Sequence, residues 1–194
     1  MLFFKKETKH FSDEQLMQMQ ANGNKNAFET LYKRYHQKMF WFFSKSLNDS
    51  IKAEDFTQDL FIKIIENPSN FDPSKKFSSW IYTVAINMCK NEWRNLENRA
   101  KNHEIIKSVE NQFIAANADK MMDYKLFKKH LDLVYKEFDI NNQLLYNLRF
   151  QQELSLKEIA EILNIPEGTV KSRLFNLVHS LSEKFKIFNH SFKL

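Results

Sequence analysis

Glycine and proline are scarce in this chain of 194 residues, which contains two glycines and three prolines. Strands joined by tight turns need more turn-forming residues than this, so the scarcity favours helices. The single cysteine, Cys89, excludes an internal disulfide and a metal site built from cysteines alone. With so little cysteine, a reducing cytoplasm is the expected location. Residues 1–6 contain too few apolar residues to form a signal peptide. No apolar run approaches the roughly 18 residues of a membrane helix, so direct membrane insertion is not expected.

Apolar residues make up 43% of the chain and include 19 phenylalanines, which is more than a disordered chain carries. The formal net charge of +5 is compatible with a polyanionic partner, but modest basicity is common in soluble proteins. The spacing of apolar residues along the chain indicates how it is divided into domains. Residues 12–97 and 123–190 carry apolar residues at helical spacing, and residues 98–122 have a weaker pattern. We predict an all-α fold with two small helical domains, 1–97 and 123–194, joined by a flexible linker over 98–122.

Within the first zone, Ser12 opens a helix that Gly23 interrupts. A later helix is predicted over 53–66, with Leu60, Phe61 and Ile65 on its buried side. Asn-Pro and Asp-Pro pairs then predict a loop over 67–76. The next helix is predicted over 78–95.

The strongest functional signal lies between residues 154 and 185. Ser155 and Glu158 have the spacing of a capping box, which begins a helix. A short turn ending in Pro166 leads into a second helix, whose apolar stripe is Val170, Leu174, Leu177, Leu181 and Phe185. Two helices joined by so short a turn form a helix-turn-helix, so the predicted second domain contains this motif.

Rotation of about 100° per residue turns one set of side chains outward near the start of the second helix: Lys171, Ser172, Phe175 and Asn176. Such positions touch base edges when a helix enters a major groove. Lys171 and Asn176 can hydrogen-bond to bases, and Phe175 can press on a thymine methyl. Arg173, at the margin, is better placed for a phosphate. The alternative is an ordinary helical hairpin with a solvated face, against which an outward Phe175 argues.

A second polar face lies on the helix predicted over 78–95, where four residues follow one another at spacings of four, three and four: Thr83, Asn87, Lys90 and Arg94. Trp80, Tyr82 and Trp93 lie near this face. Cations mixed with aromatic rings suit single-stranded nucleic acid, because bases stack on rings while phosphates meet Lys and Arg. Aromatic residues at helical spacing more often belong to a core, so a purely structural role remains an alternative.

A third, acidic face on the helix over 53–66 consists of Glu54, Asp55, Gln58 and Asp59. No histidine lies near it in sequence, and the six histidines of the chain lack the spacing of metal ligands. A solvated or protein-binding face is therefore preferred to a metal or acid–base site. The chain also lacks a phosphate-binding glycine loop and a nucleophile motif. We expect no enzymatic activity, no metal and no cofactor.

Together these segments resemble the extracytoplasmic-function (ECF) sigma factors, a small type of bacterial RNA polymerase sigma subunit. Residues 53–61, Ala-Glu-Asp-Phe-Thr-Gln-Asp-Leu-Phe, are similar to their polymerase-binding helix. Residues 77–87 are similar to their promoter-melting helix, and residues 155–174 are similar to their helix-turn-helix that reads the −35 element. The three segments stand in the family's order and spacing.

The resemblance implies core RNA polymerase and promoter DNA as partners, and it leaves an anti-sigma protein open. The polymerase-binding residues would be Glu54, Asp55, Gln58 and Asp59. The −10 strand would be captured by the loop over 67–76 and by Trp80, Thr83, Asn87, Lys90 and Arg94. The −35 duplex would be bound by Arg149, Lys157, Thr169, Lys171, Ser172, Arg173, Phe175 and Asn176. The alternative function is a one-component helix-turn-helix regulator, which would need a ligand pocket or dimer helix within residues 12–97.

Overall fold

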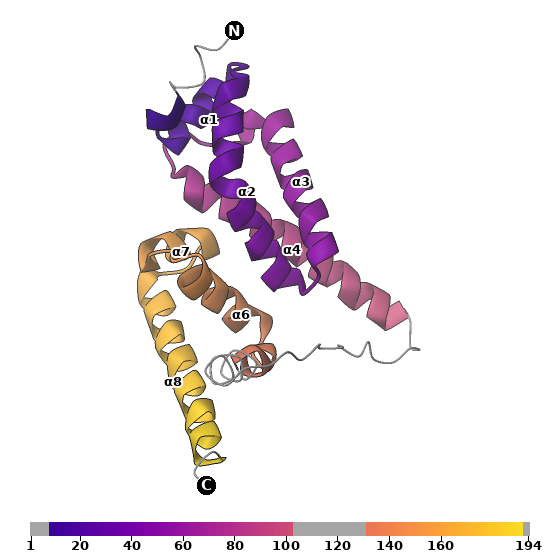
Figure 1. Ribbon diagram of the computed structural model, residues 1–194, viewed down its shortest axis with the longest axis vertical. Helices are drawn as coiled ribbons and strands as arrows, with labels where there is room; N and C mark the ends of the chain where they lie inside the picture. Colours follow the sequence, from indigo (N-terminus) through magenta and orange to yellow (C-terminus); the bar gives the residue numbers. More distant parts are fainter. Residues whose placement is uncertain (1–7, 103–130, 192–194) are drawn as a thin grey trace, which may run out of the picture.

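The computed structural model describes residues 8–102 and 131–191, and every regular element within these ranges is helical (Figure 1). The first unit contains α1 (Asp13–Ala21), α2 (Lys25–Leu47), α3 (Ser50–Glu66) and α4 (Phe77–Asn102), with short turns η2 (Thr8–His10) and η3 (Pro68–Asn70). The second contains α6 (Ile140–Tyr146), a π-helical turn η4 (Asn147–Gln151), α7 (Leu156–Leu163) and α8 (Glu167–Ser191). The all-α prediction is confirmed for these residues. In the part of the chain described, none of the helices has the length and apolar character of a membrane span.

Short polar side chains decide where the first helices begin. Ser12 caps α1 and is paired with Gln15 in a capping box, and Gly23 ends that segment with a φ of 85°, which glycine adopts without strain. Asn24 Oδ1 accepts hydrogen bonds at 3.0 and 3.2 Å from two backbone N–H groups in the first turn of α2. Asp49 Oδ1 does the same for α3, at 3.0 Å from each donor. Because Asp49 is the cap, α3 begins three residues before its predicted start.

Phenylalanine fills much of the core of the first unit. Phe42 and Phe43 of α2 are fully buried and meet edge to face, with 5.7 Å between ring centroids. Phe42 also meets Tyr82 of α4, at 5.6 Å. Burying each such side chain contributes roughly 1.5–3 kcal/mol, and the edge-to-face geometry adds to it. This cluster fixes the distance between α2 and α4.

The second unit packs on the first through α7 and α4 (Figure 1). The Tyr82 hydroxyl donates to Gln152 Oε1 at 2.7 Å, and the Ser79 hydroxyl donates to Glu161 Oε2 at 3.1 Å. The π-helical turn places Asn147, which is buried, so that its side-chain amide donates to the backbone oxygen of Phe42 at 3.4 Å. These contacts join residues 70 to 105 positions apart in the chain.

Two further details of the predicted first unit are wrong. Ile65 is expected on the buried side of α3 but is 48% exposed. Thr57 is fully buried, and its hydroxyl is satisfied there by donating to the Ala53 oxygen at 2.7 Å. Helix α4 continues to Asn102, seven residues beyond the predicted end, since no breaker follows residue 95. The predicted linker over 98–122 lies mostly outside the described residues, and the domain boundaries remain predictions.

Candidate functional site

The helix-turn-helix forms as its sequence predicts. Ser155 caps α7 by accepting from the Glu158 N–H at 3.3 Å, and Glu158 Oε2 accepts from the Ser155 N–H at 3.0 Å. The turn follows at Asn164, whose φ of 53° lies in the left-handed region that asparagine tolerates. Val170 is fully buried on the inner side of α8. The first turns of α8 are therefore presented at a fixed angle by α7.

We expect Ser155→Ala to lower the free energy of unfolding by about 1 kcal/mol at neutral pH, because α7 loses its cap. The Ser155 hydroxyl and N–H both donate to Glu158, and these bonds hold the pKa of Glu158 below its ordinary value. Stabilisation from the carboxylate is thus present above the unfolded pKa and lost as pH falls through the folded pKa. Urea unfolding should show a large difference from wild type at neutral pH and a smaller one in acid. Ser182→Ala, at an exposed position within α8, is the matched control and should change little.

The outward residues of α8 lie where rotation about the helix predicted them. Five of the predicted side chains in its first half are exposed: Lys171, Ser172, Arg173, Phe175 and Asn176. Phe175 is 72% exposed and lies parallel to the His179 ring, with 6.5 Å between centroids and 6° between planes. An exposed apolar ring among hydrogen-bonding side chains can meet a thymine methyl while its neighbours reach base edges.

The three other predicted −35 residues come from η4, from α7 and from the first turn of α8. Lys157 is exposed in the first turn of α7. Arg149 is exposed and its Nη1 donates to the Leu154 oxygen at 2.8 Å, which orders the segment leading into α7. Thr169 is half-buried, and its backbone oxygen accepts from the Ser172 hydroxyl at 3.1 Å. Lys157 and Arg149 are suited to phosphates, whereas Thr169 helps to order the start of α8.

The polar face of α4 is open along most of its length. Asn87, Lys90 and Arg94 are exposed, so each can reach a ligand without losing a packing contact. Thr83 is half-buried, and its hydroxyl donates to the Ser79 oxygen at 2.9 Å within the same helix. The face can therefore offer an amide and two cations to a strand of nucleic acid.

The aromatic residues near this face are mostly structural. Tyr82, expected beside it, is only 2% exposed, because it packs on α2 and bonds to Gln152. Trp93 is half-buried and its Nε1 donates to the Ser46 oxygen of α2 at 3.3 Å. Trp80 is half-buried against Phe71, at 5.3 Å between ring centroids, and against Phe77 at 5.7 Å. Of the three rings, only Trp80 lies beside the 67–76 loop.

The α4 face also approaches the helix-turn-helix. Lys90 of α4 and Arg173 of α8 line one groove of about 320 Å³, whose other walls come from α6 and the end of α7. Each of the two predicted DNA-binding faces therefore contributes one cationic side chain to the same groove. Sequence spacing gave no signal of this convergence, because it depends on how the two units pack.

The outer face of α3 combines acidic and apolar side chains. Asp55, Gln58 and Asp59 are exposed, and Glu54 lies at the edge of the face with its Oε1 3.8 Å from His36 Nε2 of α2. Ile51 is 79% exposed and Ile62 is 48% exposed on the same helix. Exposed isoleucines beside carboxylates are typical of a surface that meets another protein. The sequence pattern identified the acids but missed the isoleucines.

Cys89 lies in the core of the first unit, and burial raises the pKa of its thiol to about 12. The thiol is therefore protonated at neutral pH and chemically inert there. Over residues 8–102 and 131–191 no three histidine, cysteine or carboxylate side chains come together as a metal site would require.

Family models match both units. The Sigma-70 region 2 model matches residues 31–99, which include the outer face of α3 and the polar face of α4. The Sigma-70 region 4 model matches residues 142–177, which include α7 and the exposed start of α8. The ECF RNA polymerase sigma factor SigW of Bacillus subtilis is 30% identical over 161 residues, covering 78% of this chain and 85% of SigW. The chain belongs to the ECF RNA polymerase sigma factors. A second relative of this ECF sigma factor, the RNA polymerase sigma-H factor of Pseudomonas aeruginosa, is 28% identical over 172 residues and covers 84% of the chain and 88% of the relative.

Solved structures share the fold of this ECF sigma factor. CnrH, in complex with the cytosolic domain of CnrY, has a TM-score of 0.66 at 19% identity, covering 90% of this chain and 97% of that one. The sigma factor RpoE of Bartonella quintana, in complex with the anti-sigma factor NepR, has a TM-score of 0.63 at 19% identity, covering 82% and 97%. The ECF interpretation of the sequence is confirmed, and the one-component regulator is not favoured, because the region 2 match occupies the part where a sensor would lie.

Proposed function

We propose that this ECF sigma factor binds core RNA polymerase through α3, reads the −35 element through α8, and opens the −10 region through α4. The observation that carries the proposal is that each predicted face presents exposed side chains within the segments matched to sigma regions 2 and 4: Asp55 and Asp59 on α3, Asn87 and Lys90 on α4, and Phe175 and Asn176 on α8. The chain is proposed to work as two domains, 1–97 and 123–194, with residues 98–122 between them, and no catalytic step is assigned to it.

The three faces have different tasks. Phe175 and Asn176 distinguish bases in the −35 duplex, while Arg149, Lys157 and Arg173 meet phosphates and bind without regard to sequence. Asn87, Lys90 and Arg94 meet the −10 strand after it has separated. A protein without ATP chemistry opens a duplex only by binding the open strand better than the closed one, so these residues must gain contacts on melting.

Docking on core polymerase is assigned to the acidic and apolar face of α3. Reversing Asp55 and Asp59 together to lysine should leave the helix content unchanged and weaken affinity for core polymerase by about tenfold or more. A single exposed ion pair contributes less than about 1 kcal/mol, but the double reversal adds repulsion wherever the partner is basic. The measurement is a titration of labelled sigma factor with core polymerase.

The matched control for this docking prediction is Glu97→Lys with Glu167→Lys, which makes the same change in net charge at exposed positions on α4 and α8. Core affinity should be close to wild type in that variant. Unchanged core affinity of the Asp55/Asp59 variant would remove α3 from the docking surface.

The groove shared by Lys90 and Arg173 bears on regulation. The groove brings one cation of the predicted −10 face and one cation of the predicted −35 face to a common space, so a partner that occupied the groove would cover both cations. Since the two structural relatives are described in complexes with partner proteins, one of them named an anti-sigma factor, we propose an anti-sigma protein that holds this arrangement as a further partner. The site of action is the cytoplasm, where core polymerase works.

A further inference from the structure

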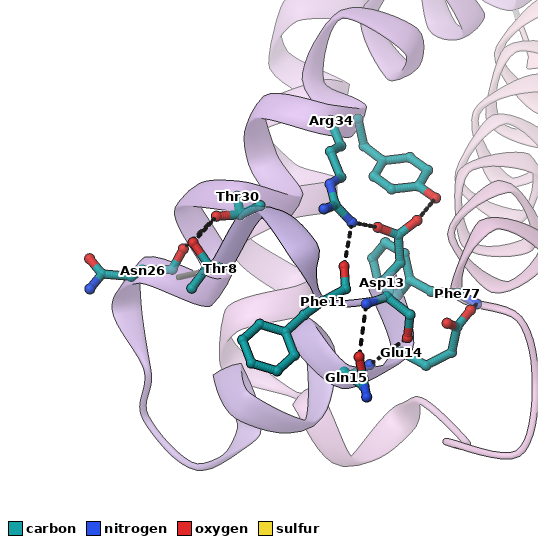
Figure 2. Close-up of polar contacts among 11 residues, drawn as sticks. Thr8, Phe11, Asp13, Glu14, Gln15, Asn26, Thr30, Arg34 and Phe77 are labelled. Atoms are coloured by element: carbon teal, nitrogen blue, oxygen red, sulfur yellow. Dashed lines mark hydrogen bonds and ion pairs between the residues drawn. The ribbon is translucent and has the colours of Figure 1, made fainter. Parts of the chain in front are cut away.

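Helix α4 receives its cap from a distant helix. The first N–H groups of a helix have no partner within it and usually bond to the side chain just before the helix. That residue is Lys76, whose ammonium only donates. The Phe77 N–H instead donates to Glu14 Oε1 of α1, at 3.0 Å and 63 residues away in the chain (Figure 2). A carboxylate also suits the positive end of the helix dipole.

Glu14 is itself held firmly. Its neighbour Asp13 accepts from the Arg34 guanidinium of α2, as Figure 2 shows. Asp13 also accepts from the Tyr35 hydroxyl of the same helix. Leu16 of the same helix is fully buried. Helix α1 is thus held on α2 by contacts that do not involve α4. It can therefore act as a rigid support for the α4 cap.

The charge of Glu14 agrees with this role. Burial raises the pKa of Glu14. The hydrogen bonds that Glu14 accepts, above all from the Phe77 N–H, lower the pKa, and so does the positive charge of Lys76. Together they outweigh burial and leave the pKa below its ordinary value. The side chain is therefore an anion at neutral pH, when it accepts from the helix terminus.

The cap lies at the end of the loop that joins α3 to α4. The middle of this loop is anchored by Phe71, which is buried and meets Phe77 at 5.6 Å between ring centroids. Asp72 Oδ1 orders the next turn by accepting from the Ser74 N–H at 2.9 Å. Helix α1 also contacts η3 at the beginning of the loop. Both the loop and the first turn of α4 are therefore positioned by contacts with α1. The hydrogen bond from the Phe77 N–H to Glu14 is the contact at the end of the loop.

We propose that Glu14 is a positioning residue for promoter melting, which fixes the 67–76 loop and the start of α4 in the geometry that receives the separated −10 strand. This inference rests on the proposed melting role of α4. Glu14 touches no DNA in it. Strand capture gains from a loop that is already ordered, because a loose loop must lose conformational freedom on binding.

The test uses holoenzyme reconstituted from the full chain and core polymerase, with a promoter mapped by sequencing its run-off transcripts. The probe is a single-stranded oligonucleotide covering the unpaired −10 region of that promoter. Glu14→Ala should bind it about fivefold to tenfold more weakly, a loss typical of a missing helix cap. Glu14→Gln keeps the acceptor oxygen and should recover most of the affinity. Affinities for core polymerase and for −35 duplex should not change.

The matched control is Gln15→Ala, the next residue in α1, whose Oε1 accepts from the Ser12 N–H at 2.9 Å. This variant loosens the start of α1 without removing the α4 cap. Equal loss of strand binding in Gln15→Ala and Glu14→Ala would show a general effect of α1 stability and overturn the positioning role. Hydrogen exchange of the Phe77 amide is the second readout: it should speed up in Glu14→Ala only, and unchanged protection would also overturn the role.

Asn87→Ala in the same assay separates this inference from the proposed function. Weak strand binding by Asn87→Ala together with normal binding by Glu14→Ala overturns the positioning role alone. Normal binding by both variants overturns the melting role of α4 and the inference with it.

Discussion

A sigma factor carrying Asn87→Ala and Lys90→Ala is expected to bind core polymerase and the closed promoter normally and to fail at opening DNA. Both side chains are exposed, so their removal leaves the fold intact. Opening costs about 1.4 kcal/mol per base-pair step on average, which only contacts to the separated strand can offset. Two lost contacts of roughly 1 kcal/mol each lower the equilibrium constant for opening by about thirtyfold.

Permanganate reactivity of unpaired thymines measures this loss directly. A template with a pre-melted −10 bubble should restore only part of the activity, because the strand is then separated but still poorly held. The control is Lys25→Ala with Asn26→Ala, which removes the same two kinds of side chain from exposed positions at the start of α2. Normal thymine reactivity in the Asn87/Lys90 variant would show that this face of α4 does not melt the promoter.

The second large effect is expected at the −35 element. Phe175→Ala should weaken binding by roughly 1–3 kcal/mol at a single base pair and relax the preference there, and Asn176→Ala should do the same at a neighbouring pair. The fold should tolerate the change, because Phe175 is 72% exposed. The measurement is a set of duplexes, each with one −35 base pair replaced, titrated with each variant.

Phosphate-directed residues give the contrast for this second prediction. Arg149→Ala or Lys157→Ala should weaken every duplex alike and make affinity less sensitive to salt, because fewer counterions are released on binding. Equal weakening of all duplexes by Phe175→Ala would place that ring among the general contacts and refute its role in reading bases.

The sequence alone predicted the features that are settled within one or two helical turns. The Ser155–Glu158 box, the turn at Pro166 and the inward Val170 all form as predicted, because caps and apolar periodicity act over three to seven residues. The exposed positions of Phe175 and Asn87 followed from the same periodicity, since the direction of a side chain on a helix is fixed by its neighbours. The resemblance to ECF sigma factors could be seen in the sequence because each of its three segments is a pattern of neighbouring residues.

Packing between distant segments decided the rest. Periodicity placed Tyr82 near a polar face, but only the position of α2 and Gln152 shows that the ring is buried. Ile65 was predicted inside and lies outside, because an amphipathic stripe is wider than the surface that covers it. The bond from Glu14 to Phe77 and the groove shared by Lys90 and Arg173 join residues more than 60 positions apart. Such contacts produce no pattern of fixed spacing in the sequence, because they form only when the common core has brought the helices together.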